Sequence, residues 1–360
     1  MTPAKPYSWL AGLRGRRGIA LISVLWVLVL LSLIAASFSR TTRTEVEFAR
    51  NLVDNAKAEA LADAGVYRAI IGVSEPLESD KWLANGTPYV IQFPGGEVTV
   101  TIQDEVGKID LNETQDSLLQ GLFTLAGVEP LVSWGLVDAI VDFRDTDHLT
   151  KAKGAEDKEY AAAGLPHDAK DAPFESVEEL RQVMGMTYDL YEKVAPLLTV
   201  HSRRPGFNPN FAPREVLLAL PGVGDEKVDA FLDERSLFAD KKNEAQRRQE
   251  EALASGDGAR SEAEDQEGQE EALFEGSNED LLNILSEAPE ISRFFTLGRS
   301  RGTMTVRAEA RTASGGVFIR EALLQIRRGR LKSVRFLNWR RGAGVELLPA
   351  GDEAEVLEEQ

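Results

Sequence analysis

The N-terminal part of the chain is marked by one long apolar run. Residues 19–39 (IALISVLWVLVLLSLIAASFS) hold no charged side chain, and serine is their only polar residue type. As a helix with a rise of about 1.5 Å per residue, this run spans about 30 Å, the thickness of a bilayer core. The pattern therefore predicts a transmembrane helix over residues 19–39.

The helical pattern continues beyond this run but becomes amphipathic. Small and apolar residues recur at spacings of three and four, with charged residues on the other face, and no proline interrupts residues 19–72. We therefore expect one helix of about 54 residues. The alternative is a membrane anchor followed by a separate surface helix. The expected stripe consists of Ala49, Val53, Ala56, Ala60, Ala64, Tyr67 and Ile71.

Alternating apolar and polar residues predict β-strands in two separate places. Residues 87–93 and 97–103 flank Pro94-Gly95-Gly96, which is a hairpin signal. A long helix packed on a small antiparallel sheet is an α+β fold, and we expect that class. The later strands are expected at residues 303–312, 316–327 and 332–339.

The sequence between the two groups of strands, residues 105–295, has a helical composition. Within it, residues 110–128, 175–200 and 208–235 share a helix–tight turn–helix pattern, a weak internal repeat of about 25–30 residues. We therefore expect a large all-α domain with helix–hairpin–helix-like repeats, inserted into the sheet. Residues 240–272 are acidic and poor in large apolar side chains, which predicts a flexible loop.

Composition and charge exclude several functions. The 360 residues carry 41 basic and 59 acidic side chains, a formal net charge of −18, which repels phosphate backbones overall. The absence of cysteine excludes disulfides, a thiol nucleophile and a cysteine-based zinc site. His148, His167 and His201 show no paired ligand spacing, and neither Gly-x-Ser-x-Gly nor a P-loop occurs. We therefore expect no enzymatic activity.

The residues before the apolar run determine its orientation. Residues 1–18 contain four basic residues and no acidic one, which keeps this end in the cytoplasm. Three interpretations remain: a signal peptide cleaved at Ala35-Ala36-Ser37, a permanent signal anchor, or a prepilin-type leader cut after Gly18. The glycine between the arginine pair and the apolar run favours the third, as does the continuation of the helix.

This segment resembles the N-terminus of type IV pilins and type II secretion pseudopilins. The resemblance implies cleavage between Gly18 and Ile19 by a prepilin peptidase and methylation of Ile19. Most members carry glutamate at the fifth mature position, where this chain has Ser23. A missing glutamate and a large helical insertion are typical of the K-type minor pseudopilin family, which the chain resembles over nearly its whole length.

The resemblance implies a type IV pilin-like fold and a role at the tip of the type II secretion pseudopilus, in assembly initiation and in protein export across the outer membrane. Implied partners are the I- and J-type minor pseudopilins, contacted through residues 46–71, the major pseudopilin and the prepilin peptidase. We expect a single-pass inner-membrane protein with its bulk in the periplasm. The expected parts are the leader 1–18, transmembrane helix 19–39, helix extension and first strands 40–104, inserted domain 105–295, last strands 296–340 and acidic tail 341–360.

A DNA-uptake or type IV pilus component is the alternative class. The Leu-Pro-Gly-Val-Gly turn at residues 220–224 resembles the phosphate-binding turn of helix–hairpin–helix modules. However, Asp225 and Glu226 follow it, with only Lys227 as a nearby base. We therefore expect tight helical packing here and no nucleic-acid partner.

An acidic segment of the expected insertion is a candidate metal site. Residues 142–160 read DFRDTDHLTKAKGAEDKEY, and carboxylate oxygens on a loop suit a hard cation such as Ca²⁺. The spacing is not that of an EF-hand, and a solvated acidic loop is the alternative. The K-type resemblance adds support, because these subunits carry a similar Gly-Ala-Glu-Asp-x-x-Tyr segment and bind calcium. We therefore expect Ca²⁺ at Asp145, Asp147, Glu156 and Asp157.

Overall fold

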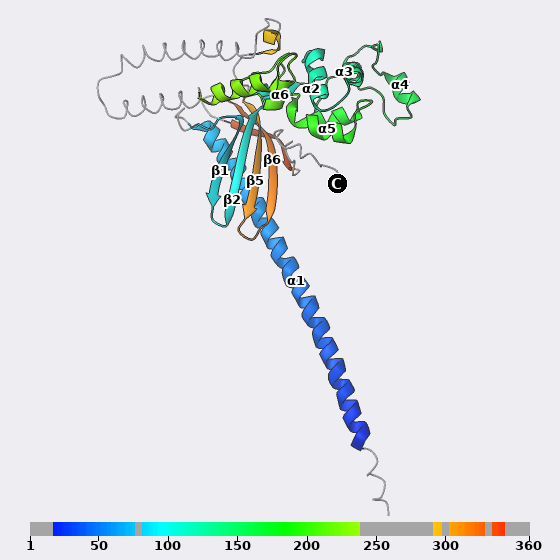
Figure 1. The fold of residues 1–360 in the computed structure, drawn as a ribbon, viewed down its shortest axis with the longest axis vertical. Helices are drawn as coiled ribbons and strands as arrows, with labels where there is room; N and C mark the ends of the chain where they lie inside the picture. Colours follow the sequence, from blue (N-terminus) through cyan, green and yellow to red (C-terminus); the bar gives the residue numbers. More distant parts are fainter. Residues whose placement is uncertain (1–16, 76–80, 238–290, 297–301, 328–332, 343–360) are drawn as a thin grey trace, which may run out of the picture.

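The computed structural model describes residues 17–75, 81–237, 291–296, 302–327 and 333–342 of the chain. Helix α1 (Arg17–Ser74) forms a long stem, with an antiparallel sheet along its C-terminal part and a helical region beyond the sheet (Figure 1). Most of the expected leader, the acidic loop 240–272 and nearly all of the acidic tail lie outside the described residues.

Helix α1 confirms the single long helix that the sequence predicts, with 58 residues instead of about 54. Leu21–Phe38 has a mean hydropathy of 2.6, and none of it is buried. By length and composition, this is the one helix in the described part of the chain that could cross a membrane. The amphipathic half continues from it without a break, because no proline or glycine pair interrupts the backbone hydrogen bonds.

The amphipathic half of α1 has two apolar faces. One face packs against the sheet and is fully buried; it consists of Ala58, Ala62, Gly65, Val66 and Ala69. At about 100° per residue, the stripe expected from the sequence lies on the opposite side of the helix. Most of that stripe is exposed, including Val53 at 51% and Tyr67 and Ile71 at 55% each. The sheet therefore packs on the small-residue face, and most of the expected stripe is exposed, although Tyr67 also touches the rings of Phe336 and Trp339.

The main sheet contains five antiparallel strands in the order β1-β2-β5-β6-β7. The predicted strands are confirmed to within about two residues at each end. Because β2 pairs with β5 along its whole length, from Gly96 with Thr312 to Asp104 with Met304, the helical region begins and ends at the same place on the sheet. The strands are β1 (Asn85–Phe93), β2 (Gly96–Asp104), β5 (Thr303–Thr312), β6 (Val317–Arg327) and β7 (Ser333–Arg341).

A buried arginine fastens α1 to the sheet. Arg320 on β6 is 7% exposed, and its guanidinium donates to Asp63 and Glu59 of α1, at 2.6 Å in each case. The same group lies over the rings of Phe318 and Trp339, at 4.9 and 5.2 Å from their centroids. Charge-assisted hydrogen bonds to two carboxylates satisfy the buried cation, so this contact joins the helix and the sheet without an unpaired charge.

The helical region has its own hydrophobic core, which is separate from that between α1 and the sheet. It also contains one short parallel strand pair, β3 with β4, so its described part is mainly helical and not purely so. Its α-helices and strands include β3 (Ile109–Asp110), α2 (Asp116–Leu125), α3 (Pro130–Arg144), α4 (Asp157–Ala162), α5 (Tyr188–Val194), β4 (Leu198–Thr199) and α6 (Arg214–Leu218), and residues 225–237 are also helical. The 3-10 helices are η2 (Glu105–Gly107), η3 (Val177–Gln182), η4 (Ala195–Leu197) and η5 (Ile291–Phe294).

The three helix–turn–helix segments expected from the sequence share one backbone feature. Gly127, Gly185 and Gly222 each have positive φ, at 92°, 87° and 76°, and each stands between two helical segments. Glycine adopts this conformation without the steric cost that a Cβ brings, so it ends one helix and redirects the chain into the next. The repeat is therefore a repeated turn geometry.

Candidate metal site

The acidic segment expected to bind metal connects α3 to α4. Glu156 is the N-cap residue of α4, and its backbone N–H donates to the carboxylate of Glu159 at 3.0 Å. Asp145 is the C-cap residue of α3. In Figure 1, α4 lies at the outer end of the helical region. The loop between the two helices therefore brings carboxylates from two helix ends toward one another.

Two aspartates of α3 hold this loop in place. Asp142 is fully buried, and its Oδ2 accepts a hydrogen bond from the backbone N–H of Lys151 at 3.0 Å. Asp138 accepts a second from the backbone N–H of Lys153 at 3.1 Å. A Cβ on Gly154 would stand 1.9 Å from Oδ2 of Asp142, so only glycine fits at this position. These contacts fold the loop back onto α3.

The fold brings three of the four expected ligands together. Asp145, Asp147 and Glu156 each offer an oxygen within 4.8 Å of the other two. Glu156 forms a second group of the same compactness with His148 and Asp171. Glu156 is therefore shared by both groups, and it is only 4% exposed. We call the residues Asp142, Asp145, Asp147, His148, Glu156 and Asp171 the acidic cluster.

The acidic cluster contains most of the unsatisfied buried polar atoms in the described part of the chain. Eight buried side-chain nitrogen or oxygen atoms there lack a hydrogen-bond partner, and five of them belong to this cluster. They are both oxygens of Glu156 and one oxygen each of Asp142, Asp145 and Asp171. A buried polar atom without a partner is costly, and several such acceptors at one place fit a cation.

Burial and mutual repulsion disfavour the ionised carboxylates. Burial raises the pKa of Glu156 to about 7, with further contributions from the charges of Asp142, Asp171 and Asp145. Burial also raises the pKa of Asp142, to which Asp145 adds, and the pKa of Asp145, to which Asp147 adds. Like charges without an opposite charge between them make the free cluster unfavourable in its ionised form.

The donor set fits Ca²⁺ in its chemistry. Ca²⁺ takes six to eight oxygen ligands, and carboxylates on a loop supply them. His148 is the one nitrogen donor and has a side chain that is 74% exposed, with Nδ1 at 3.6 Å from Asp171. Because all the buried donors in the described cluster are oxygens, a soft metal has no set of ligands that it prefers here.

The sequence did not identify every member of the cluster. Asp157, which we expected as a ligand, is exposed at the start of α4 and belongs to neither compact group. Asp171 comes from the segment before Phe174, and no spacing in the sequence connects it with Glu156. Its backbone has φ 52°, which is unusual for a residue other than glycine. Such a conformation appears only in the structure, so no sequence signal could have found it.

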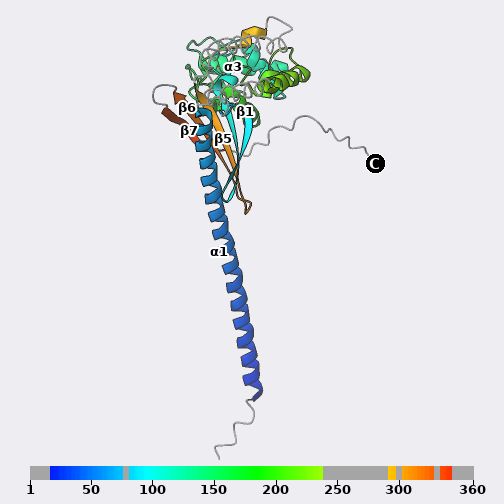
Figure 2. The same cartoon turned by 90° about the vertical axis from the view of Figure 1, so that its left-hand side faces the viewer.

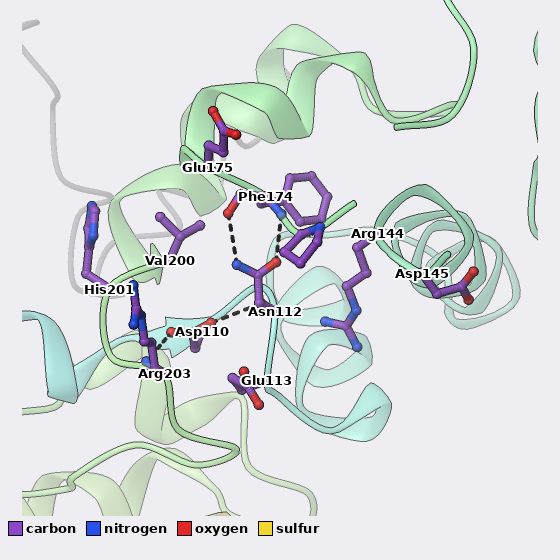
Figure 3. A pocket seen from close by; sticks show the side chains of 11 residues that line it. Asp110, Asn112, Glu113, Arg144, Asp145, Phe174, Glu175, Val200, His201 and Arg203 are labelled. Atoms are coloured by element: carbon purple, nitrogen blue, oxygen red, sulfur yellow. Dashed lines mark hydrogen bonds between the residues drawn. The ribbon is translucent and has the colours of Figure 1, made fainter. Parts of the chain in front are cut away.

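A cavity of about 740 Å³ adjoins the cluster (Figure 3). Asn112 lies at its centre, donating to the carbonyl of Phe174 at 2.9 Å and accepting from its backbone N–H at 2.8 Å. Asp110 accepts from Ser202 at 2.9 Å and from the backbone N–H of Arg203 at 2.7 Å. These side chains act as structural connections between loops. Figure 3 shows Asp145 at the edge of the cavity, with its carboxylate turned away from Asn112.

The turn at residues 220–224 has little capacity to bind phosphate. The arginine nearest in sequence, Arg214, pairs with Asp225 at 2.7 Å and with Asp229 at 2.8 Å. Its charge is therefore balanced within the protein, and a phosphate backbone would meet these carboxylates close to the turn. The geometry supports the expectation of a packing turn.

Comparisons with known proteins find a matching family model and several curated relatives. A family model described as type II secretion system (T2SS), protein K, matches residues 101–203, which include the acidic cluster. The chain is 28% identical to type II secretion system protein K of Pseudomonas aeruginosa over 244 residues, or 60% of this chain and 73% of that protein. It is 27% identical to the Klebsiella pneumoniae protein of the same name over 202 residues, or 50% of this chain and 61% of that protein.

These matches relate the chain to the type II secretion machinery. Residues 101–203 are similar to the protein K family of that system, as is the longer stretch aligned with the two relatives. Among solved structures, it superposes at 20% identity and a TM-score of 0.45 on a chain of the GspK–GspI–GspJ complex from enterotoxigenic Escherichia coli, covering 84% of this chain and 99% of that one. The alignment to the Klebsiella relative spans about three fifths of that protein's length.

Proposed function

We propose that the chain is a minor pseudopilin of the type II secretion system, acting at the tip of the pseudopilus in assembly initiation and in export across the outer membrane. This proposal rests on α1, a single continuous helix whose two halves differ in their contacts. Its first half is apolar and exposed, and its second half packs a small antiparallel sheet on one face only. We also propose that this is a type IV pilin-like fold with the helical region as an insertion.

The position of the helical region favours the tip. Figures 1 and 2 show it beyond the end of the sheet, at the opposite end of α1 from the apolar half. A subunit of a helical shaft needs space above it for the next subunit along the axis. A bulky region at that end leaves no such space but is compatible with a terminal position.

We propose that a prepilin peptidase cuts between Gly18 and Ile19 and leaves the apolar helix in the inner membrane, with the bulk of the chain in the periplasm. N-terminal sequencing of the membrane-extracted protein should then begin at Ile19. A first residue at Phe38 would show cleavage by an ordinary signal peptidase and would contradict the pseudopilin proposal. Removal of the leader also makes the net charge more negative by four units, because residues 1–18 hold four basic residues and no acidic one.

We propose that the exposed stripe of α1 packs against the helices of the I- and J-type minor pseudopilins and of the major pseudopilin. It follows the apolar half on the same helix and lies on the side opposite the buried face, although its Tyr67 also packs on Phe336 and Trp339 of β7. Its central residues, Ala56 and Ala60, are small and exposed, so a second helix could approach closely. The interface would then extend from the membrane to the level of the sheet.

The double variant Ala56→Arg with Ala60→Arg should reduce co-purification of the full-length chain with the I- and J-type subunits by about tenfold or more, since two charges would be desolvated against an apolar face. Asn51→Arg with Asn55→Arg adds the same charge to exposed positions on another side of the helix and should have little effect. An equal loss of co-purification in both double variants would indicate a general effect of added charge. Undiminished binding of the stripe variant would contradict the proposed interface.

We also propose that Ca²⁺ binds the acidic cluster, held by Asp145, Asp147 and Glu156. The unsatisfied buried oxygens and the raised pKa of Glu156 support this proposal. A bound cation would supply the opposite charge that the cluster lacks and would connect α3 to α4. Asp142 and Asp171 would then support the ligands or complete the coordination.

A further inference from the structure

The two edges of the five-stranded sheet differ in how they are protected. At one edge, β1 contains Pro88 and an irregular pairing between Asn85 and Pro88, both of which discourage a further strand. At the other edge, β7 has nine residues and contains neither proline nor glycine, although its pairing with β6 skips Leu337. No strand among the described residues pairs with its outer side. Its outward-facing backbone groups are therefore available for pairing.

The side chains of β7 are those of an interaction surface. Val334, Phe336 and Leu337 are 37%, 39% and 38% exposed. Phe336 packs edge-to-face on Trp339, with ring centroids 5.2 Å apart, and on Tyr67 of α1, at 6.2 Å. Exposed aromatic side chains next to arginines are characteristic of the centres of protein interfaces. The rings also hold one another in place, so little entropy is lost when a partner covers them.

The charge of this edge is opposite to that of the chain as a whole. The chain carries a net charge of −18, whereas β7 has three arginines and no acid. Arg340 is paired with Glu321 and Glu178, at 3.1 and 2.5 Å. In contrast, no ion pair joins Arg335 or Arg341 to a described carboxylate; Arg335 is exposed, and Arg341 lies over the ring of Phe318, 5.0 Å from its centroid. A partner that brings carboxylates to this edge could form ion pairs with both arginines.

We infer that the outer edge of β7 is a docking site for an extended acidic segment of another polypeptide, which adds to the sheet as a sixth strand. Strand addition pairs the free backbone groups. One set of alternate side chains of the segment would reach Phe336 and Arg341 on one face of the sheet, and the other set would reach Arg335 on the opposite face. A docked helix would leave the backbone groups of β7 unpaired. Anionic lipid is remote, because Tyr67 lies 29 residues beyond Phe38, or about 44 Å along the helix. This inference does not depend on the proposed function.

A labelled, acetylated eight-residue peptide of alternating glutamate and valine tests the site by fluorescence polarisation against the full-length chain in detergent. We expect binding that weakens by about tenfold or more in the double variant Arg335→Glu with Arg341→Glu. Arg203→Glu with Arg311→Glu makes the same charge change at exposed positions elsewhere and should leave binding unchanged. Phe336→Ala, which keeps every charge, should also weaken binding and serves as the second variant if the double variant melts early.

Two methylated peptides test whether the bound segment forms a strand. One carries backbone N-methyl groups on its odd residues and the other on its even residues, with charge and side chains retained. In an added strand, alternate N–H groups point toward the sheet, so one peptide should bind like the parent and the other should not. The inference would be overturned if the two methylated peptides bound equally well, or if polyglutamate bound as tightly as the parent peptide. Either result would show that charge attraction alone explains the binding.

Two further outcomes would also overturn it. If the parent peptide does not bind, the arginines of β7 serve only to prevent edge-to-edge aggregation. If a DNA duplex displaces the peptide and depends on the same two arginines, the site belongs to a nucleic acid and not to a polypeptide.

Discussion

Millimolar Ca²⁺ is expected to raise the melting temperature of the full-length chain, and a chelator to lower it. A ligand that binds only the folded state stabilises it by about 2.7 kcal/mol at 100 times its dissociation constant. Mg²⁺ should do less, because it dehydrates reluctantly and requires a tighter octahedron. The measurement is thermal unfolding followed by tryptophan fluorescence. Identical curves in calcium and in chelator would show that the cluster is only an acidic loop.

Glu156→Gln should remove the calcium shift and, in chelator, raise the melting temperature above that of the wild type. The substitution takes away a buried charge that faces Asp142, Asp145 and Asp171, and its amide can donate to them. Asp157→Asn is the matched control at the neighbouring exposed position and should retain the shift. Asp145→Ala with Glu156→Ala should also remove it. A metal-free Glu156→Gln protein less stable than the wild type would contradict this view of the cluster.

The difference in stability between Glu156→Gln and the wild type should depend on pH, and the pKa of Glu156 gives the direction of this dependence. Because the pKa of Glu156 is raised from 4.5 to about 7 in the folded chain, the folded state binds more protons than the unfolded state between these values. The contribution of Glu156 to stability is therefore present below its unfolded pKa and is lost as the pH rises through 7. In chelator, the advantage of Glu156→Gln over the wild type should grow across this range.

Gly65→Leu should destabilise the packing of α1 on the sheet by about 3 kcal/mol, at the upper end of the cost of overpacking a core. A Cβ at this position would stand 2.7 Å from Val98, 3.1 Å from Ala308 and 3.2 Å from Val100. These contacts come from β2 and β5 at the centre of the sheet, which cannot move aside without losing their pairing. The free energy of unfolding measured in urea would report the change.

Ala60→Leu is the control for this prediction. It adds the same side chain to an exposed position on the same helix, where leucine and alanine have similar helix propensity. Its stability should change by less than about 0.5 kcal/mol. If both variants unfold alike, close approach at Gly65 does not determine how the helix sits on the sheet.

Much of the fold was predictable because it rests on local patterns. The apolar run, the three- and four-residue spacing and the missing prolines determine α1, and alternation in sequences such as TMTVRAEART determines the strands. The glycines of the helical turns were visible for the same reason. A pattern of this kind identifies the residues that share a face of a helix or strand, but it does not identify what packs against that face.

The candidate site was predictable only in part. Asp145, Asp147 and Glu156 lie close together in the sequence, and a short loop brings them into one cluster. Asp171 reaches the cluster from a different segment through a left-handed backbone conformation. The burial of Glu156, which raises its pKa, depends on the packing of the loop against α3, and no local pattern contains that information.

By itself, the sequence determined the long helix, the strands, the mainly helical region between them and the acidic segment that joins α3 to α4, because each follows from the order of neighbouring residues. Only the tertiary structure decided which face of α1 meets the sheet. Both faces carry small apolar residues, but Gly65 allows the closest approach on one of them. Only the structure also placed β7 at a sheet edge with two arginines that form no ion pair with a described carboxylate, because strand order is set by pairing between residues far apart in the chain.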